Sequence, residues 1–359
     1  MRSIPAQIKS YAPGFALALV IALLAKGIEA LLPFDVIGAS VIAMFIGMLI
    51  NGYRKPGKTT APGVKFTAKK ILKFAIILLG ASLNVTTILN VGRMSLTVML
   101  FTLLTCFGGG YFIGRALGLD WKLSNLISAG TGICGGSAIA AVAPVIDAKD
   151  SDIAYALSAT FLFDMAMIVL FPIMGRAMGL SDMAYGLWTG TAVNDTSSVV
   201  AAGYAFSEGA GDFATMVKLT RTLAIIPITL VLGIVMARKE SADESASNAQ
   251  AASEPSSTRR KGPLGNFSLK RAFPMFILFF LVASLITTIA VAAGADAAVF
   301  APLKTLSKFF IVMAMAAIGL NTDLVKLVKS GAKPLLMGLI CWICIAAASL
   351  GMQHMLGLW

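Results

Sequence analysis

Four ionisable side chains lie inside apolar stretches of the sequence, where a charge is costly. Asp164 and Asp195 lie near the centres of two successive apolar runs, and Lys218 and Arg221 follow in the next run. A charge that faces lipid at such a depth costs at least ~2.5–3.5 kcal/mol, so we expect these groups to face the protein interior and to pair or bind a ligand. Lys218 and Arg221 are three residues apart and therefore share one face of a helix.

Two stretches of glycine and small polar residues interrupt the neighbouring runs. The first, 130–138, is glycine-rich, and the second, 190–198, matches it without a gap. Each glycine weakens a helix by ~0.8–1 kcal/mol relative to alanine, so each stretch predicts a discontinuous or re-entrant helix. Freed backbone is tolerated in a membrane where it lines a polar cavity or packs in protein. The candidate binding residues in these stretches are Thr131, Gly132, Gly135, Gly136, Ser137, Asn194, Asp195, Thr196, Ser197 and Ser198.

Cations beside interrupted helices suit an anionic ligand. The planar guanidinium of Arg221 fits a tetrahedral oxyanion or a carboxylate, with Lys218 beside it. The free N–H groups at the start of each half-helix would add donors. Asp164 or Asp195 would then carry a coupling proton or help to hold Na⁺. Two other interpretations stay open: close helix packing through the glycines, and a structural ion pair of Arg221 with Asp164 or Asp195.

The overall composition excludes a water-soluble fold. Of the 359 residues, 58% are hydrophobic and only 13% are charged, whereas soluble domains carry roughly 45–50% apolar and about 25% charged residues. The apolar runs are continuous and do not alternate as barrel strands would. We therefore expect an all-α polytopic membrane protein in a lipid bilayer. Basic cytoplasmic loops explain the net charge of +12, and no nucleic-acid partner is expected.

About eleven transmembrane helices are expected, because about 20 apolar residues cross a ~30 Å hydrocarbon core. The candidate spans are 12–32, 34–50, 66–84, 94–117, 122–146, 152–178, 183–207, 213–237, 271–293, 299–320 and 332–356. The polar stretch 238–268 indicates a flexible cytoplasmic linker. It divides the first eight spans, in 1–237, from the last three, in 269–359.

The basic loops predict an orientation, because Lys and Arg are enriched in cytoplasmic loops. The run 54–73 holds several basic residues and no acidic one, so we place it in the cytoplasm. Counting alternately from this run puts the N-terminus in the cytoplasm and the C-terminus outside. The same count puts Arg115 and Arg176 inside and the acidic turn 147–152 outside. It does not decide whether the two interrupted spans cross fully or turn back, since reversing both leaves the later spans unchanged.

A second internal match indicates inverted repeats. Residues 73–84 resemble 308–321 if two residues are inserted, and the predicted spans that carry them point in opposite directions. An inverted pair of this kind is typical of secondary transporters.

Several motifs together resemble the YeiH-type sulfate exporter family over nearly the whole chain. The matching segments are 132–141, 144–146, 195–203, 217–221 and 309–320. The resemblance implies a place in the cation–proton antiporter and anion transporter superfamily, with broken helices and an elevator-like core that moves against a scaffold, often in a homodimer. It also implies export of sulfate or an organosulfonate across the bacterial inner membrane. Where the family commonly has a histidine and a glutamine, this chain has Asn194 and Ser198, so Asp164, Asp195 or Na⁺ would provide the coupling.

The predicted function is therefore secondary active transport of a small oxyanion. The alternative is a Na⁺/H⁺-coupled cation antiporter or a sodium symporter, in which Asp164 and Asp195 are ion ligands and Arg221 is structural. An enzyme is not expected, because no H-E-x-x-H motif occurs and His354 is the single histidine. We expect no cofactor and no metal site.

Overall fold

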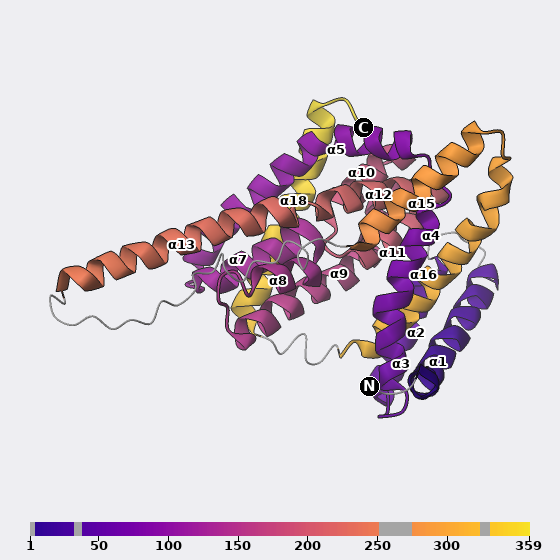
Figure 1. The fold of residues 1–359 in the computed structure, drawn as a ribbon, viewed down its shortest axis with the longest axis horizontal. Coiled ribbons are helices and arrows are strands. Elements are labelled where there is room, and N and C mark those ends of the chain that lie inside the picture. The colour runs from indigo at the N-terminus through magenta and orange to yellow at the C-terminus, as the bar shows by residue number, and fades with distance from the viewer. Residues whose placement is uncertain (1–3, 32–37, 251–274, 324–330) are drawn as a thin grey trace.

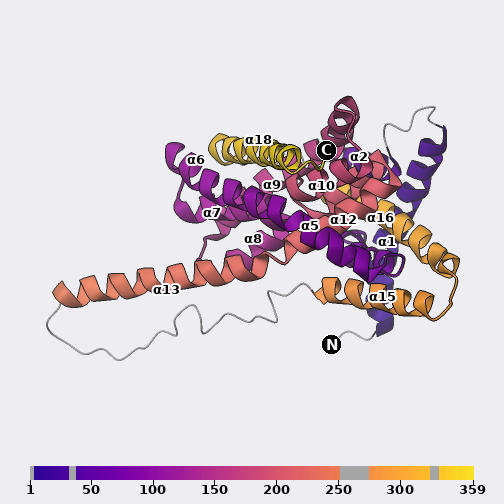
Figure 2. The same ribbon diagram turned by 90° about the horizontal axis from the view of Figure 1, so that it is seen from above.

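The computed structural model describes residues 4–31, 38–250, 275–323 and 331–359, which are helical almost throughout (Figures 1 and 2). The elements are α1 (Ile4–Leu31), α2 (Ala39–Tyr53), α3 (Ala61–Phe66), η1 (Thr67–Ile71), α4 (Leu72–Gly80), α5 (Val85–Leu104), η2 (Thr105–Gly109), α6 (Gly110–Ala116), α7 (Trp121–Ala129), η3 (Gly130–Cys134), α8 (Gly136–Val142), α9 (Asp150–Ala177), α10 (Asp182–Ala192), α11 (Thr196–Phe206), α12 (Glu208–Thr222), α13 (Ile225–Gln250), α15 (Met275–Ala292), η5 (Ala297–Phe300), α16 (Ala301–Asn321) and α18 (Ala332–Met355). No strand occurs in the described residues, so the predicted all-α class is confirmed.

The helices are long enough and apolar enough to cross a membrane. Seven helical passes in the described residues meet both conditions: α1, α5 to α6, α9, α12 to α13, α15, α16 and α18. Helix α2 and the continuous run from α3 to α4 pack against α1 and α16. In Figure 1, helices α1 to α4, α15 and α16 form one group, and α5 to α12 with α18 form the other. We call the first the scaffold group and the second the hairpin group.

The surface is apolar while several charges are buried, which is the reverse of a soluble protein. Leu100, Phe112 and Ile286 are more than half exposed, whereas Lys218 and Arg221 are 0% exposed. Large exposed apolar patches on a protein of this size mark contact with a membrane or a partner. The bilayer is therefore the solvent for this surface, and the buried charges lie where protein groups can satisfy them.

The first interrupted span is a re-entrant hairpin. Helix α7 continues through η3 to Gly135, whose φ of 66° and ψ of −135° end the helix, and α8 returns. At the base of the hairpin, Lys122 Nζ donates to the carbonyl oxygen of Asp147 at 2.6 Å. The chain therefore enters and leaves at the same end of the molecule. We call residues 121–147 the first hairpin.

The second interrupted span is also a hairpin. Helix α10 ends at Ala192, and residues 193–195 are extended before α11 begins. Tyr185 of α10 donates its hydroxyl to the carbonyl of Ala202 at 3.0 Å and stacks on Phe206 with ring centroids 3.9 Å apart. Residues 182–206 thus form the second hairpin, with both of its ends together.

The two hairpins enter from opposite ends of the molecule and meet at their tips. Helix α9 has 28 residues and joins the base of the first hairpin to the base of the second, so the bases are separated by ~42 Å of helix at ~1.5 Å per residue. At the tips, a Cβ built on Gly135 would lie 3.0 Å from Cβ of Asp195. The prediction of two re-entrant or discontinuous helices is confirmed, and the gapless sequence match falls on the two tips.

The hairpins correct the predicted sidedness of two turns. The acidic turn 147–152 lies at the same end as Lys122, because the Lys122–Asp147 hydrogen bond joins them. Arg176 lies at the opposite end, where its Nη2 donates to the carbonyls of Ala205 and Phe206 at 2.9 and 3.2 Å. The prediction that the turn 147–152 lies on the opposite side from Arg115 is therefore wrong. The prediction that Arg176 lies on the same side as Arg115 is wrong as well. Both errors arise from counting a hairpin as a crossing, and they cancel for the later spans.

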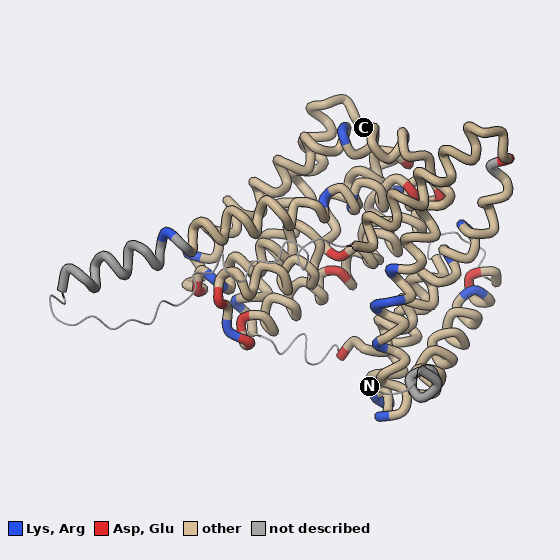
Figure 3. Tube along the Cα trace, viewed as in Figure 1, with Lys and Arg blue, Asp and Glu red and all other residues tan. Residues whose placement is uncertain are grey.

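One ion pair agrees with the count for the remaining spans, and Figure 3 shows the basic and acidic residues of the described fold. Lys55, in the basic run, binds Asp323 at 2.7 Å, so the end of α2 and the end of α16 lie at the same end of the molecule.

The predicted linker 238–268 begins inside α13, which extends to Gln250. The rest of that linker, with its Arg259–Arg260–Lys261 cluster, lies outside the described residues, as do Lys326 and Lys329.

Cysteine labelling can test the hairpin topology. In a background without the native cysteines, Lys149→Cys should react with an impermeant maleimide from the same membrane side as Lys58→Cys. Asp182→Cys should react from the side that labels Ala295→Cys, because the second hairpin starts at the opposite end. Spans that cross fully would reverse both pairings, and that outcome would contradict the fold.

Candidate substrate site at the hairpin tips

The two hairpin tips are joined by cations from α12. Lys218 Nζ donates to the carbonyl of Ile133 at 2.7 Å and to that of Val193 at 2.8 Å. Arg221 donates to the carbonyls of Thr131, at 3.3 Å, and Val193, at 3.4 Å. Each cation therefore binds one carbonyl of each hairpin. We call these tips, with Lys218, Arg221 and Asp164, the tip junction.

The location of the cations follows from helix chemistry. The last carbonyls of a helix have no partner within the helix, and the C-terminal end carries partial negative charge. Both η3 and α10 end at the junction, so each presents such carbonyls inside the protein. Burial of carbonyls without donors is unfavourable, and the two cations three residues apart on α12 provide the donors.

Lys218 and Arg221 are bound unequally. The hydrogen bonds of Lys218 are short for N–H···O bonds, whereas both bonds of Arg221 lie beyond the usual 2.7–3.2 Å range. In addition, the Nε atom of Arg221 has no hydrogen-bond partner in the protein. Lys218 therefore has the geometry of a structural tie, and Arg221 keeps donor capacity for another group.

The two carboxylates organise the second tip. Asp195 caps α11, because its Oδ2 accepts from the backbone N–H of Ser197 at 2.9 Å and from the Ser197 hydroxyl. Asp164, on α9, accepts from the backbone N–H of Asp195 at 3.0 Å. Neither carboxylate has an oxygen within 4.0 Å of a nitrogen of Lys218 or Arg221, all four residues being described. The alternative of a structural ion pair between Arg221 and an aspartate is therefore not what the structure contains.

Several buried polar atoms at the junction have no protein partner. They are Oδ2 of Asp164, both amide atoms of Asn194 and Nε of Arg221, with Thr160 Oγ1 one turn before Asp164 on α9. An unpartnered buried polar atom costs about 1–3 kcal/mol, and buried groups of this kind are normally satisfied. Both donors and acceptors are present in this set. It can therefore bind a small polar ligand, an ion or water.

The structure brings some of the predicted site residues together at the junction and leaves others outside it. Thr131 supplies a carbonyl, Gly135 the turn, and Asp195 and Ser197 the cap. Ser137 is exposed and Gly136, Asp195 and Thr196 are half-buried, so the starts of α8 and α11 reach the surface. Gly132 packs on Cys106, and Ser198 is buried in α11.

Sequence reasoning missed Thr160 and the carbonyls of Ile133 and Val193. A backbone carbonyl leaves no signature in the residue type, so these two could not be found. Thr160 lies four residues before Asp164 and shares its helix face. That spacing was the available signal for Thr160.

Removing the tie should destabilise the protein. Lys218→Met removes the donor from the buried carbonyl of Ile133 and leaves that of Val193 with only the long bond from Arg221. We therefore expect the free energy of unfolding to fall by about 2–5 kcal/mol. Chemical denaturation or thermal melting in detergent measures this loss. Lys333→Met is the matched control, because Lys333 is exposed at the start of α18. Equal effects of the two substitutions would exclude a tie through Lys218.

Comparisons with known proteins agree on one family. The model described as conserved hypothetical protein 698 matches residues 13–338. A UPF0324 membrane protein of Clostridium tetani is 47% identical over 353 residues, which are 98% of this chain and 99% of that protein. A relative of the same name from Streptococcus pyogenes serotype M18 is 48% identical, with 97% and 98% covered, and one from Streptococcus mutans is 46% identical, with 91% and 92% covered. The chain belongs to the UPF0324 membrane protein family.

Proposed function

We propose that this protein is a secondary active transporter of a small oxyanion, with sulfate or an organosulfonate as the favoured substrate. The observation that carries the proposal is the binding state of Arg221, which is fully buried, held by two long hydrogen bonds and unpartnered at Nε. A guanidinium presents a planar fork that matches the oxygens of such an anion. Asn194 can add an amide donor at the same place.

The opposed hairpins support alternating access. Each hairpin reaches the tip junction from its own end of the molecule, so opening one exposes the junction to one face only. Broken helices that meet at mid-membrane depth are the sites of substrate and coupling ions in many secondary transporters. The division into two helix groups supports an elevator-like movement of the hairpin group against α1 to α4, α15 and α16 (Figure 1).

Asp164 and Asp195 are the proposed coupling groups. Asp195 is engaged in capping α11, whereas Asp164 keeps one oxygen without a partner. Asp164 is thus better placed to take up a proton or to bind Na⁺ together with oxygens of Asn194 or Thr160. The same set of oxygens favours the second candidate, a cation antiporter or sodium symporter in which Arg221 has only a structural role.

The sequence resemblance supplies the rest of the proposal. The resemblance to YeiH-type sulfate exporters suggests export, a homodimer and the bacterial cytoplasmic (inner) membrane. The names of the relatives say only that they are membrane proteins. The basic run 54–73 supports a cytoplasmic N-terminus and a C-terminus outside the cell.

Anion-dependent stabilisation tests the role of Arg221. Ligand that binds the folded state raises stability by RT ln(1 + [L]/Kd), so the melting temperature in detergent should rise with the right anion. We expect a rise with sulfate, sulfite, taurine or sulfoacetate at constant ionic strength. Arg221→Gln should abolish this rise, whereas Asp164→Asn should keep it. The same rise in Arg221→Gln would remove Arg221 from the binding site.

Transport in proteoliposomes tests the coupling role. We expect Asp164→Asn to keep exchange of the anion but to lose accumulation driven by a proton or Na⁺ gradient, because the coupling oxygen is gone. Asp152→Asn, a substitution at the start of α9 and away from the junction, should behave as the unsubstituted protein. A melting shift with Na⁺ or Li⁺ alone, lost in Asp195→Asn and unaccompanied by any anion response, would instead support the cation transporter.

A further inference from the structure

A cavity with several polar lining residues lies at the base of the first hairpin. It has a volume of about 280 Å³ and lies between α6 and α7, with Arg115, Tyr111 and Trp121 around it. Ser124, Asn125 and Ser128 of α7 line the hairpin side of this cavity. We call it the base pocket. It is separate from the tip junction, because none of the junction residues lines it.

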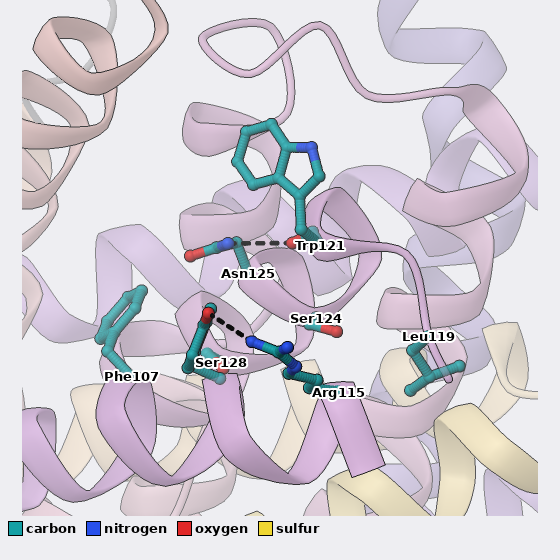
Figure 4. Close-up of a pocket in the computed structure, with 8 residues that line it drawn as sticks. Phe107, Arg115, Leu119, Trp121, Ser124, Asn125 and Ser128 are labelled. Atoms are coloured by element: carbon teal, nitrogen blue, oxygen red, sulfur yellow. Dashed lines mark hydrogen bonds between the residues drawn. The ribbon is translucent and has the colours of Figure 1, made fainter. Parts of the chain in front are cut away.

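The base pocket carries one positive charge and no negative one. Among the described residues that line it, Arg115 is the only charged one, and its guanidinium donates to the Tyr111 hydroxyl at 3.5 Å, a long hydrogen bond. Figure 4 shows this guanidinium pointing to the Ser128 side of the pocket and away from Leu119. The nearby carboxylate of Asp120 is engaged as the cap of α7, where it accepts from the backbone N–H of Lys122 at 2.8 Å.

The polar side of the base pocket is built into the helix packing. Ser124 and Ser128 are 6% and 2% exposed, and they lie against Gly114 and Gly110 of α6. A side chain on either glycine would collide with the serine hydroxyl opposite, so the glycines allow α6 to approach a polar face of α7. The Ser124 hydroxyl donates to the carbonyl of Asp120 at 3.0 Å, and Asn125 Nδ2 donates to that of Trp121 at 2.9 Å. The Ser128 hydroxyl and the second amide N–H of Asn125 are the donors left beside Arg115, and this chemistry fits a sulfonate, sulfate or phosphate group.

The face of α7 that lines the base pocket continues along the helix toward the tip junction. Ser124, Ser128 and Thr131 are spaced by four and three residues and share one side of the helix. Ser128 is ~4.5 Å along the axis from Thr131, whose carbonyl binds Arg221. The pocket also lies at the end of the molecule that holds Lys122 and the turn 147–152.

We infer that the base pocket is an admission site, in which Arg115 binds the oxyanion before it reaches Arg221. The identity of the anion rests on the proposed function, but binding at the pocket can be measured without transport. A lipid headgroup offers the same oxyanion chemistry. The small volume and the buried serines favour a free anion over a headgroup.

Trp121 fluorescence tests binding directly. The protein is placed in phosphatidylcholine nanodiscs and titrated with sulfate or taurine, with chloride as the ionic-strength control. Subtracting the titration of Trp121→Phe isolates the response of this one indole. We expect a saturable change that weakens about tenfold or more in Arg115→Gln and is largely restored in Arg115→Lys. Arg93→Gln, which removes an exposed arginine of α5 outside the pocket, should leave the change intact.

Transport kinetics separate this inference from the proposed function. Arg115→Gln should raise KM for anion presented at the base-pocket face by about tenfold and leave kcat within about twofold, whereas Arg221→Gln should remove transport. An unchanged KM in Arg115→Gln, with no Trp121 response, would overturn the admission site and leave the proposed function standing. A Trp121 response in a protein that transports no anion would support anion binding at the base pocket and contradict the proposed transport function.

Lipid composition decides the source of the oxyanion. The fluorescence of Trp121 is compared in nanodiscs with and without phosphatidylglycerol. A response to phosphatidylglycerol, with none to sulfate or taurine, would overturn the admission site and identify a headgroup site. A response to the free anions in phosphatidylcholine alone would support it.

Discussion

The structure depends on the hydrogen bonds from Lys218 to one carbonyl in each hairpin. Two helices that stop inside a membrane leave carbonyl oxygens in a medium without water, and each unsatisfied group there is costly. An ammonium group with three donors can bind both helix ends at once. A charge that would be unfavourable in lipid thus becomes the group that permits the interruption, and the interruption brings the two hairpin tips together inside the protein.

The hairpin group and the scaffold group are joined by a second set of charges at one end. Lys304 of α16 binds Glu208 and Asp212 of α12 at 2.7 and 2.6 Å, and Lys308 binds Glu208 at 2.8 Å. Tyr204 of α11 donates to Asp212 at 2.5 Å. These side chains are partly exposed, so their contribution to stability is modest and can be exchanged for water. Such contacts are compatible with the elevator-like movement proposed above, because they can break and re-form without exposing apolar core.

Much of this arrangement was accessible from the sequence, since it follows from what a bilayer penalises. The apolar runs indicated the class. The glycine-rich stretch 130–138 and its match 190–198 located both interruptions, and the cost of Asp164 and Arg221 placed them inside. The hairpin turns were not accessible. A span of about 25 residues that folds back has the same composition as one that crosses. Counting the two hairpins as crossings misplaces only the turn 147–152 and Arg176 and leaves the sides of the later spans unchanged. The partners of Lys218 are backbone atoms, which no residue type reveals.

The distribution of the cation bonds has an energetic consequence. Lys218 binds Ile133 of the first hairpin and Val193 of the second, and Arg221 binds Thr131 of the first and Val193 of the second. Opening either hairpin therefore breaks one bond of each cation, so the two open states lose the same kind and number of contacts with α12. States of similar free energy are what alternating access needs, because a large difference would leave one face almost always closed. In the transport that we propose, an oxyanion would replace the carbonyl that leaves. The exchange would cost less at Arg221, where the bonds to be replaced are already long.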